Sequence, residues 1–159
     1  MGTRVIGIDL GERRIGVAVS DSRGVLASPH SVIVRSGEQK ADHRAIAALV
    51  SEFDAALVVV GLPLSLSGEV GPAAQAALAE ASALENELEV PLVLHDERLT
   101  TVEAAQLRRD SADPASRGKG PRPARRPRTR SSPESRMGID ALAATVLLQS
   151  WLDQRRMES

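Results

Sequence analysis

Short apolar runs with a period of two open the chain, a pattern typical of β-strands. Arg4–Asp9 contains three β-branched residues and is followed by the breaker Gly11, and Ile15–Ser20 alternates branched with small residues. Leu26–Val34 ends in a third such run, which Pro29 is expected to break early. Because the connections between these runs are short, we expect three antiparallel strands joined by hairpins.

Apolar positions at helical spacing then alternate with short, uniformly apolar runs. We expect a helix over Lys40–Phe53 and a strand over Ala56–Val60, the strand being buried on both faces. Pro72 opens a second helix at a favoured first-turn position, and Pro91–His95 is expected to form another buried strand. The predicted inward faces are Ile46, Leu49, Val50 and Phe53 in the first helix, and Ala74, Leu78, Ala81 and Leu88 in the second.

The last third of the chain changes character. A helix is predicted over Thr101–Arg109, where Thr100 and Glu103 match a capping box. Asp110–Arg136 holds five of the nine prolines and is predicted to be a loop without regular structure. A final helix is predicted from Ser135 to Arg155, with its inward face formed by Ile139, Ala143, Val146, Leu147 and Trp151.

This order of elements predicts the fold class. Three antiparallel strands followed by two strand–helix crossovers give an α/β fold with a mixed five-stranded sheet, in which the first strand is central. Right-handed crossovers cover the sheet with helices on both faces. The length of 159 residues suits a single domain over residues 1–159, with the Pro/Arg-rich loop at 110–136 as its main insertion.

Composition narrows the function classes. An apolar fraction of 42% is enough for a real core, and the absence of cysteine excludes disulfides, zinc–thiolate sites and thiol nucleophiles. With one Phe, one Trp and no Tyr, the chain lacks aromatic platforms for stacking bases. No signal-peptide pattern or membrane-length apolar run is present, so we expect a cytoplasmic protein without a membrane partner.

The net charge of −1 hides a strong asymmetry. The segment Arg117–Arg136 has eight basic residues and one acid, a net of +7, which leaves −8 on the rest of the chain. Such a segment can be simply a solvated loop. It can equally be an arm for nucleic acid, because arginine forks pair with phosphate oxygens. The two interpretations are compatible, since basic arms can become ordered on nucleic acid.

Acidic residues stand where strands and helices should meet. Asp9 ends the first strand, and Asp96 and Glu97 end the last one, so both positions fall on one edge of the sheet. Neighbouring strand residues face opposite ways, so the sequence leaves open whether Asp96 or Glu97 points inward. Asp140, near the start of the final helix, is by itself better explained as a helix-dipole acid, unless the start of the helix meets the same edge of the sheet. His95 is expected to be a packing residue.

If these carboxylates converge, their mutual repulsion makes them a poor structural feature but a good site for a divalent cation. Oxygen ligands favour Mg²⁺ or Mn²⁺. A pair of such ions can activate water and stabilise the leaving oxygen in phosphodiester hydrolysis. Gly7 and Gly11 beside Asp9 would allow a phosphate or another strand to approach closely.

Four stretches of the chain together resemble the YqgF/RuvX family, ribonuclease-H-like proteins described both as pre-16S rRNA nucleases and as Holliday-junction resolvases. They are Gly7-Ile8-Asp9-Leu10-Gly11 with Arg14-Ile15-Gly16-Val17-Ala18, then Val60-Gly61-Leu62-Pro63-Leu64 with Gly68, then Asp96-Glu97-Arg98-Leu99-Thr100-Thr101, and finally Ile139-Asp140-Ala141-Leu142-Ala143-Ala144 with Leu148-Gln149-Ser150-Trp151-Leu152. They occur in family order between Arg4 and Leu152. Asp110–Arg136 departs from the pattern, being longer and richer in Pro and Arg than the family's basic connection.

The resemblance implies a catalytic and metal-binding triad of Asp9, Glu97 and Asp140, with Mg²⁺ or Mn²⁺ as cofactor. It also implies a backbone role for the turn containing Gly61 and Pro63. Together with Gly7 and Gly11, these two residues are expected to be structural. The expected nucleic-acid contacts are the basic residues near the site and in the charged segment: Arg13, Arg14, Arg98, Arg117, Lys119, Arg122, Arg125, Arg126, Arg128 and Arg130.

Substrate choice stays open at this level. The family suggests processing of the 5′ end of pre-16S rRNA first and resolution of four-way DNA junctions second; the latter would require a homodimer. A nucleic-acid-binding assembly factor with inert carboxylates is a further alternative. Actin-like ATPases and sugar kinases share the Asp-x-Gly turn. They enclose ATP between two lobes, whereas 159 residues supply one, and a second phosphate-binding hairpin is missing here.

Overall fold

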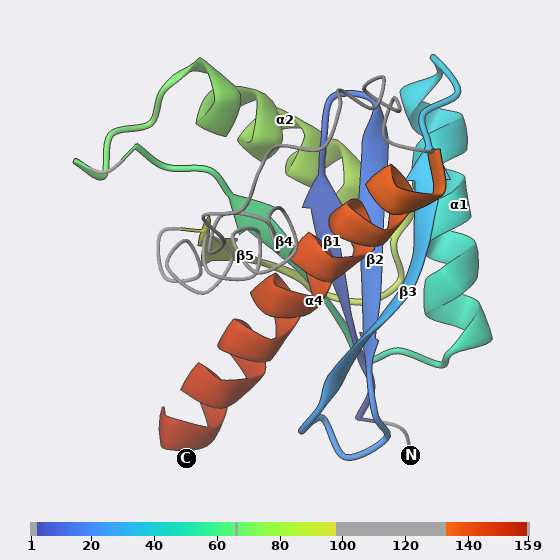
Figure 1. Cartoon of the computed structure of the whole chain (residues 1–159), viewed down its shortest axis with the longest axis vertical. Coiled ribbons are helices and arrows are strands. Elements are labelled where there is room, and N and C mark those ends of the chain that lie inside the picture. The colour runs from blue at the N-terminus through green and yellow to red at the C-terminus, as the bar shows by residue number, and fades with distance from the viewer. Residues whose placement is uncertain (1–2, 66, 98–132, 159) are drawn as a thin grey trace, which may run out of the picture.

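A computed structural model describes residues 3–65, 67–97 and 133–158. Its strands form one mixed sheet in the order β3-β2-β1-β4-β5, with β1 at the centre as predicted (Figure 1). The strands are β1 (Val5–Leu10), β2 (Arg14–Ser20), β3 (Ala27–Val34), β4 (Leu57–Leu62) and β5 (Leu92–Asp96), and the helices are α1 (Gln39–Glu52), α2 (Pro72–Glu87) and α4 (Pro133–Glu158).

The strand directions follow from the lengths of the connections. Short hairpins make β1–β2 and β2–β3 antiparallel, while the crossovers through α1 and α2 make β1–β4 and β4–β5 parallel. β3 continues through Pro29 rather than breaking there. Its register with β2 shifts between Val17 and Ala18, beside that proline, and an edge strand tolerates the missing N–H group.

The sheet separates two apolar cores. On one face α1 and α2 pack against a cluster that includes Ile6, Ile8, Val60, Ile46 and Leu84. On the other face α4 crosses the strands, in front of the sheet in Figure 1. This second cluster includes Val5, Ala18, Val59, Ala144, Leu148 and Leu152. The β1 and β4 strands are therefore buried on both faces, as their uniform apolar runs predict.

Three expectations about burial are wrong. β5 is an edge strand rather than a buried one: Leu94 is 39% exposed, and His95 is its one fully buried residue. Leu78 is exposed on α2, where Ala77 and Leu84 face the core instead. Ile139 is also exposed, because α4 is apolar on several sides and its buried row runs through Ala141, Ala144 and Leu148.

The predicted helix Thr101–Arg109 and most of the predicted loop Asp110–Arg136 lie outside the described residues. Within that loop, the described part of the chain already enters α4 at Pro133. The single-domain assignment stays a prediction. In the part of the chain that the structure describes, no helix is long and apolar enough to cross a membrane.

Candidate active site

Asp9 lies at the carboxyl end of the central strand, on the face covered by α4. Its cross-strand partner in β2 is Gly16, and directly opposed residues of a sheet project to the same face. A Cβ atom on Gly16 would collide with the main-chain carbonyl of Asp140. Since Gly16 faces the backbone of α4 at Asp140, the Asp9 side chain projects toward that same part of the helix.

Gly16 therefore explains how Asp140 comes close to Asp9 although 131 positions separate them in the sequence. Gly7, two residues before Asp9, also faces α4 directly, at residues one and two helical turns beyond Asp140. A Cβ atom there would lie 2.7 Å from Leu148 Cβ and 3.1 Å from the Ala144 carbonyl oxygen. The missing side chains let the helix rest directly on two strands, with its Asp140 end at the edge that carries Asp9.

Glu97 reaches the same face from β5. A Cβ atom on Gly61 of β4 would lie 2.5 Å from Glu97 Oε1 and 3.1 Å from Leu147 Cδ2 of α4. His95, two residues earlier, is buried against α4, where its Nε2 lies 3.1 Å from Ser150 Oγ. Strand alternation directs His95 toward α4 and Asp96 toward the opposite face. Glu97 follows directly after the strand and lies over Gly61 on the α4 side, which favours Glu97 over Asp96.

His95 is the packing residue that its sequence context suggests. Burial lowers the pKa of its imidazole, against the smaller opposing effect of the Asp96 carboxylate, so the neutral ring is favoured. A neutral imidazole can exchange a hydrogen bond with the Ser150 hydroxyl without placing an unpaired charge between β5 and α4. The contact ties the end of β5, and hence Glu97, to the helix that carries Asp140.

An arginine pairs with the Asp140 carboxylate. Arg14 Nε lies 2.8 Å from Asp140 Oδ2, an ion pair in which each side chain is about 30% exposed (30% and 31%). The Oδ2 atom is itself buried and makes no hydrogen bond within the described residues, so the Nε–H group is not directed at it. A buried carboxylate oxygen without a hydrogen bond is costly unless a cation is at hand.

As the side chains lie, no three His, Asp or Glu residues among those described are close enough together to hold a metal ion. Asp9, Glu97 and Asp140 thus lie on the same face of the sheet, at the carboxyl ends of its parallel strands. Their side chains are not arranged as a complete set of metal ligands. The donors nevertheless fit a hard divalent cation. All three are carboxylates, and Asp140 offers a buried oxygen that accepts no hydrogen bond from the residues that the structure describes.

The glycines around Asp9 have roles other than admitting phosphate. Gly7 admits α4, as described above. At Gly11 a Cβ atom would lie 2.5 Å from the Arg14 carbonyl oxygen, so this glycine is needed to close the β1–β2 turn. Its N–H group donates to that oxygen at 3.0 Å. The tight turn fixes the end of β1, which carries Asp9, and the start of β2 at Arg14.

Gly61 lies within β4, not in a turn, because the strand runs two residues further than its apolar run suggests. The turn follows it: Leu64 N–H donates to the Leu62 carbonyl at 3.0 Å, which makes Pro63 the central residue of a three-residue turn. Pro63 therefore ends β4 at the edge occupied by Asp9 and Glu97.

A buried polar network that the sequence does not reveal supports the β1–β2 turn from the other side of the sheet. Arg35 donates from Nε to the Gly11 carbonyl at 2.8 Å, and its backbone N–H group donates to the Arg13 carbonyl at 2.9 Å. Its remaining nitrogens pair with Glu80 of α2, which also contacts His43 of α1 at 3.2 Å. No local signal marks Arg35 and Glu80 as partners, because 45 positions separate them.

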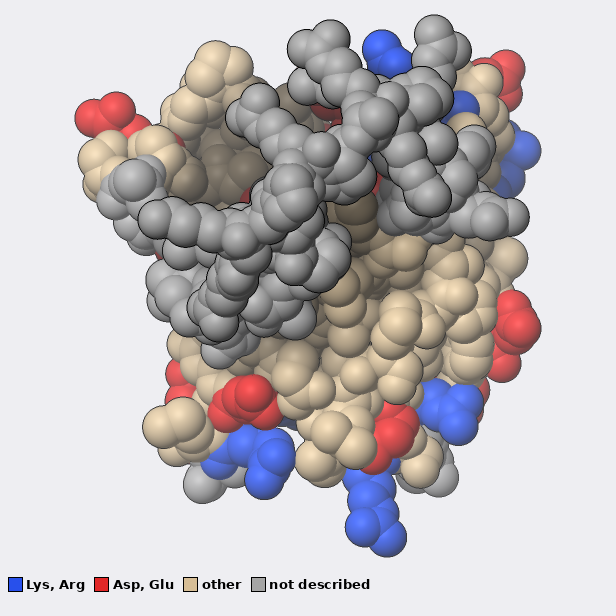
Figure 2. Space-filling view, viewed as in Figure 1, with Lys and Arg blue, Asp and Glu red and all other residues tan. Residues whose placement is uncertain are grey.

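Of the residues expected to contact nucleic acid, Arg13 is exposed beside the site and Arg14 is paired with Asp140. Arg98, Arg117, Lys119, Arg122, Arg125, Arg126, Arg128 and Arg130 lie outside the described residues. Figure 2 shows the α4 face of the molecule, where a largely uncharged surface is bordered below by side chains of both signs.

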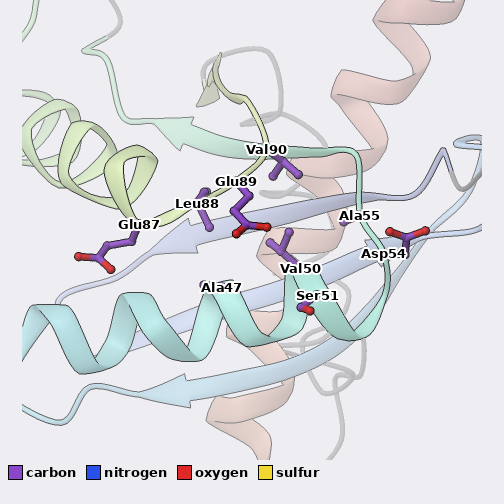
Figure 3. A pocket seen from close by; sticks show the side chains of 9 residues that line it. All are labelled: Ala47, Val50, Ser51, Asp54, Ala55, Glu87, Leu88, Glu89 and Val90. Atoms are coloured by element: carbon purple, nitrogen blue, oxygen red, sulfur yellow. The ribbon is translucent and has the colours of Figure 1, made fainter.

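The opposite edge of the sheet has a different character. A pocket of about 350 Å³ lies there between α1 and the segments that lead into β4 and β5 (Figure 3). Its ionisable lining residues are all acidic, namely Asp54, Glu87 and Glu89. The residues that line this pocket therefore offer no positive charge to a phosphate backbone.

Comparison with known proteins identifies the family. The model of a family described as "RuvX: Holliday junction resolvase" matches residues 3–121. A protein of Rhodococcus erythropolis named "Putative pre-16S rRNA nuclease" is 45% identical over 156 residues, covering 96% of this chain and 78% of its own length. The chain belongs to the RuvX family. A relative of the same name from Thermoanaerobacter pseudethanolicus is 35% identical, with 96% of this chain and 98% of its own length covered.

Membership in the family makes the chain a nuclease, a hydrolase of phosphodiester bonds. Among solved structures it is similar to Thermus thermophilus RuvC in complex with a Holliday junction substrate, with a TM-score of 0.54 and 18% identity over 97% of this chain and 96% of that one. This similarity shows the ribonuclease-H-like fold. Nucleases of this fold generally depend on divalent metal ions.

Proposed function

We propose that this protein is a Mg²⁺- or Mn²⁺-dependent endonuclease that processes the 5′ end of pre-16S rRNA, with Asp9, Glu97 and Asp140 as its catalytic carboxylates. The observation that carries the proposal is Gly16, which pairs with Asp9 in the sheet and lies against the Asp140 backbone. Relatives named for a pre-16S rRNA nuclease support the choice of substrate.

The residues of the site would have separate roles in catalysis. Asp9 lies on the central strand, and Asp140 and Glu97 approach its face from α4 and from the end of β5. These carboxylates would hold the cations, which supply an activated water and charge stabilisation at the phosphate. Gly61 leaves room for the Glu97 side chain, and the Gly11 turn fixes the end of the strand that carries Asp9. Positioning of this kind is a major source of catalysis in phosphoryl chemistry.

Basic residues would supply the affinity for the substrate. The described body of the protein is acidic, and Arg13 is exposed beside the proposed site. The net charge of +7 on Arg117–Arg136 offsets the repulsion that this body would exert on a polyanion. Since the sequence contains no base-reading motif, we expect recognition of shape and backbone.

The test is a cleavage panel with a 5′-extended pre-16S rRNA fragment, single-stranded RNA and DNA, and a four-way DNA junction, each with Mg²⁺, Mn²⁺ and EDTA. We expect metal-dependent cleavage of the pre-rRNA fragment that is lost in Asp9→Asn, Glu97→Gln and Asp140→Asn. The matched control is Asp153→Asn, which removes one exposed carboxylate from α4 more than three helical turns from Asp140. Near-full activity of a folded Asp9→Asn protein would contradict the proposal.

The family description favours a second candidate, a Holliday-junction resolvase. That activity requires two symmetric incisions, and hence a homodimer. Preferential cleavage of the four-way junction, together with a dimer in sedimentation analysis, would replace the pre-rRNA assignment while leaving the roles of the three carboxylates unchanged. Binding of either substrate without metal-dependent cleavage would instead favour a non-catalytic assembly factor.

A further inference from the structure

Arg14 occupies an unusual position for a residue expected to bind nucleic acid. It begins β2, two residues before Gly16, and so lies on the same face as Asp9 and α4. Its guanidinium is directed at Asp140 rather than at solvent, with Nε 2.8 Å from Oδ2. The charge that touches the proposed metal ligand is therefore supplied by the protein itself.

The contact is electrostatic without being a well-formed hydrogen bond. Arginine usually meets a carboxylate with its N–H groups directed at the oxygens, as Arg35 does with Glu80 at 2.6 and 2.9 Å. Asp140 Oδ2 has no such bond within the described residues although it is buried. Arg14 thus compensates the charge of Asp140 while leaving the lone pairs of Oδ2 without a directed donor.

We propose that Arg14 is a placeholder cation, which neutralises Asp140 in the metal-free protein and must withdraw from Oδ2 when a divalent ion binds there. An ion coordinated by Oδ2 would lie about 2.1 Å from that oxygen. With Arg14 Nε also 2.8 Å from it, the two positive charges would lie within a few ångströms of each other. The site therefore exchanges one cation for another.

This exchange gives Arg14 two opposite effects, one on the stability of the metal-free protein and one on the affinity for the metal ion. It stabilises the metal-free fold, because Asp140 would otherwise keep a buried oxygen with neither a cation nor a hydrogen bond. It also weakens metal binding, because the ion must displace it. Once displaced, the guanidinium remains beside the site, where it can pair with a substrate phosphate. The inference rests on the proposed function, since it takes Asp140 as a metal ligand.

The test measures Mn²⁺ affinity without using activity. Free Mn²⁺ is followed by electron paramagnetic resonance during titration of the wild-type protein, of Arg14→Gln and of Arg13→Gln. We expect Arg14→Gln to lower the Kd for Mn²⁺ by about tenfold, one unit of charge at direct contact. Arg13→Gln removes the same charge one residue away without removing this ion pair, so its Kd should change much less. Without metal, Arg14→Gln should have the lower Tm, and Mn²⁺ should raise that Tm more than in the wild type.

An unchanged or higher Kd in Arg14→Gln would overturn the inference and make Arg14 a residue that orients Asp140. If Arg14→Gln does not fold, Arg side-chain Nε–Hε resonances of the wild-type protein provide the measurement. The Arg14 signal, assigned with Arg14→Lys, should move on Mg²⁺ saturation, and a signal that stays in place would equally overturn it. Failure of the proposed function looks different: the wild-type protein would then neither bind Mn²⁺ nor cleave.

Discussion

The Arg35 guanidinium donates two parallel hydrogen bonds to the Glu80 carboxylate, of 2.6 and 2.9 Å, and its Nε donates to the Gly11 carbonyl at 2.8 Å. One side chain thus connects α2 to the turn that ends the strand carrying Asp9. The pair is largely buried, with 19% and 11% of the two side chains exposed. Bidentate geometry of this kind fixes orientation as well as charge.

Glu80→Gln should destabilise the protein by about 2–3 kcal/mol, because it leaves the mostly buried Arg35 cation without its carboxylate. His43 loses a partner as well. Urea denaturation at neutral pH measures the effect. Glu85→Gln is the matched control, since it removes the same charge from an exposed position of α2. A loss as small as that of Glu85→Gln would show that the pair adds little to stability.

The same pair predicts a pH dependence. Burial alone would raise the pKa of Glu80, but the hydrogen bonds from Arg35 and His43 outweigh it and lower that pKa below its ordinary value of 4.5. The folded protein therefore binds this proton less readily than the unfolded chain. The contribution of ionised Glu80 is fully present above about pH 4.5 and is lost as the pH falls through the folded-state pKa.

The difference in unfolding free energy between the wild type and Glu80→Gln should accordingly be constant near neutral pH and shrink below pH 4.5. Its slope cannot exceed about 1.4 kcal/mol per pH unit for one proton. Denaturation curves taken at intervals down to the acid limit of folding provide the measurement. A difference that grows on acidification would mean that the pKa of Glu80 is raised, not lowered.

The approach of α4 to the sheet can be tested at two glycines. Gly16→Ala places a methyl group against the Asp140 carbonyl and should cost about 2 kcal/mol or more, because backbone must move. Gly138→Ala lies in α4 with nothing within 4 Å of the new methyl group, so it should stabilise the helix by about 0.5–1 kcal/mol. Both values come from thermal or chemical unfolding. Similar effects from the two substitutions would contradict the packing described here.

Much of this fold follows from periodicity in the sequence. The alternation before residue 35 and the two later apolar runs predict all five strands, and the short hairpins fix which of them are antiparallel. The inward face of α4 does not follow, because that helix is apolar on several sides and its rotation depends on where the glycines of the sheet let its backbone approach. Gly16 is the signal that could have been used, since a glycine opposite an acidic strand end indicates a close backbone approach.

The candidate site can be predicted in part, because the strand pattern locates the ends of the strands. Strand ends place Asp9 and Glu97 at one edge, but they leave Asp96 and Glu97 equivalent until His95 is seen buried against α4. The ion pair of Arg14 with Asp140 and the network of Arg35 join residues far apart in sequence. Their pairing depends on side-chain directions across two elements, which periodicity does not specify.

The basic segment offers a test of substrate affinity that is independent of the chemistry. Replacing Arg122, Arg125, Arg126 and Arg128 with Gln should weaken binding to every nucleic acid and flatten the slope of log K against log salt by roughly two to four units. Turnover at saturating substrate should change little. The control replaces four exposed basic residues elsewhere, Arg23, Lys40, Arg44 and Arg155, and so removes the same charge. Equal slopes for the two variants would assign the salt dependence to net charge alone.

Gly61→Ala tests whether the placement of Glu97 matters for catalysis. The new methyl carbon would lie 2.5 Å from Glu97 Oε1 and 3.1 Å from Leu147 Cδ2, so the carboxylate must move while β4 can keep its place. Displacement of a catalytic group by about 1 Å can cost about a hundredfold, and we expect metal-dependent cleavage to fall by about tenfold to a hundredfold. Single-turnover cleavage with saturating enzyme measures the chemical step and separates it from substrate binding. Gly71→Ala is the control, because its new methyl group meets nothing within 4 Å and lies at the start of α2. Full activity of a folded Gly61→Ala protein would show that Glu97 does not act from the position it has over β4.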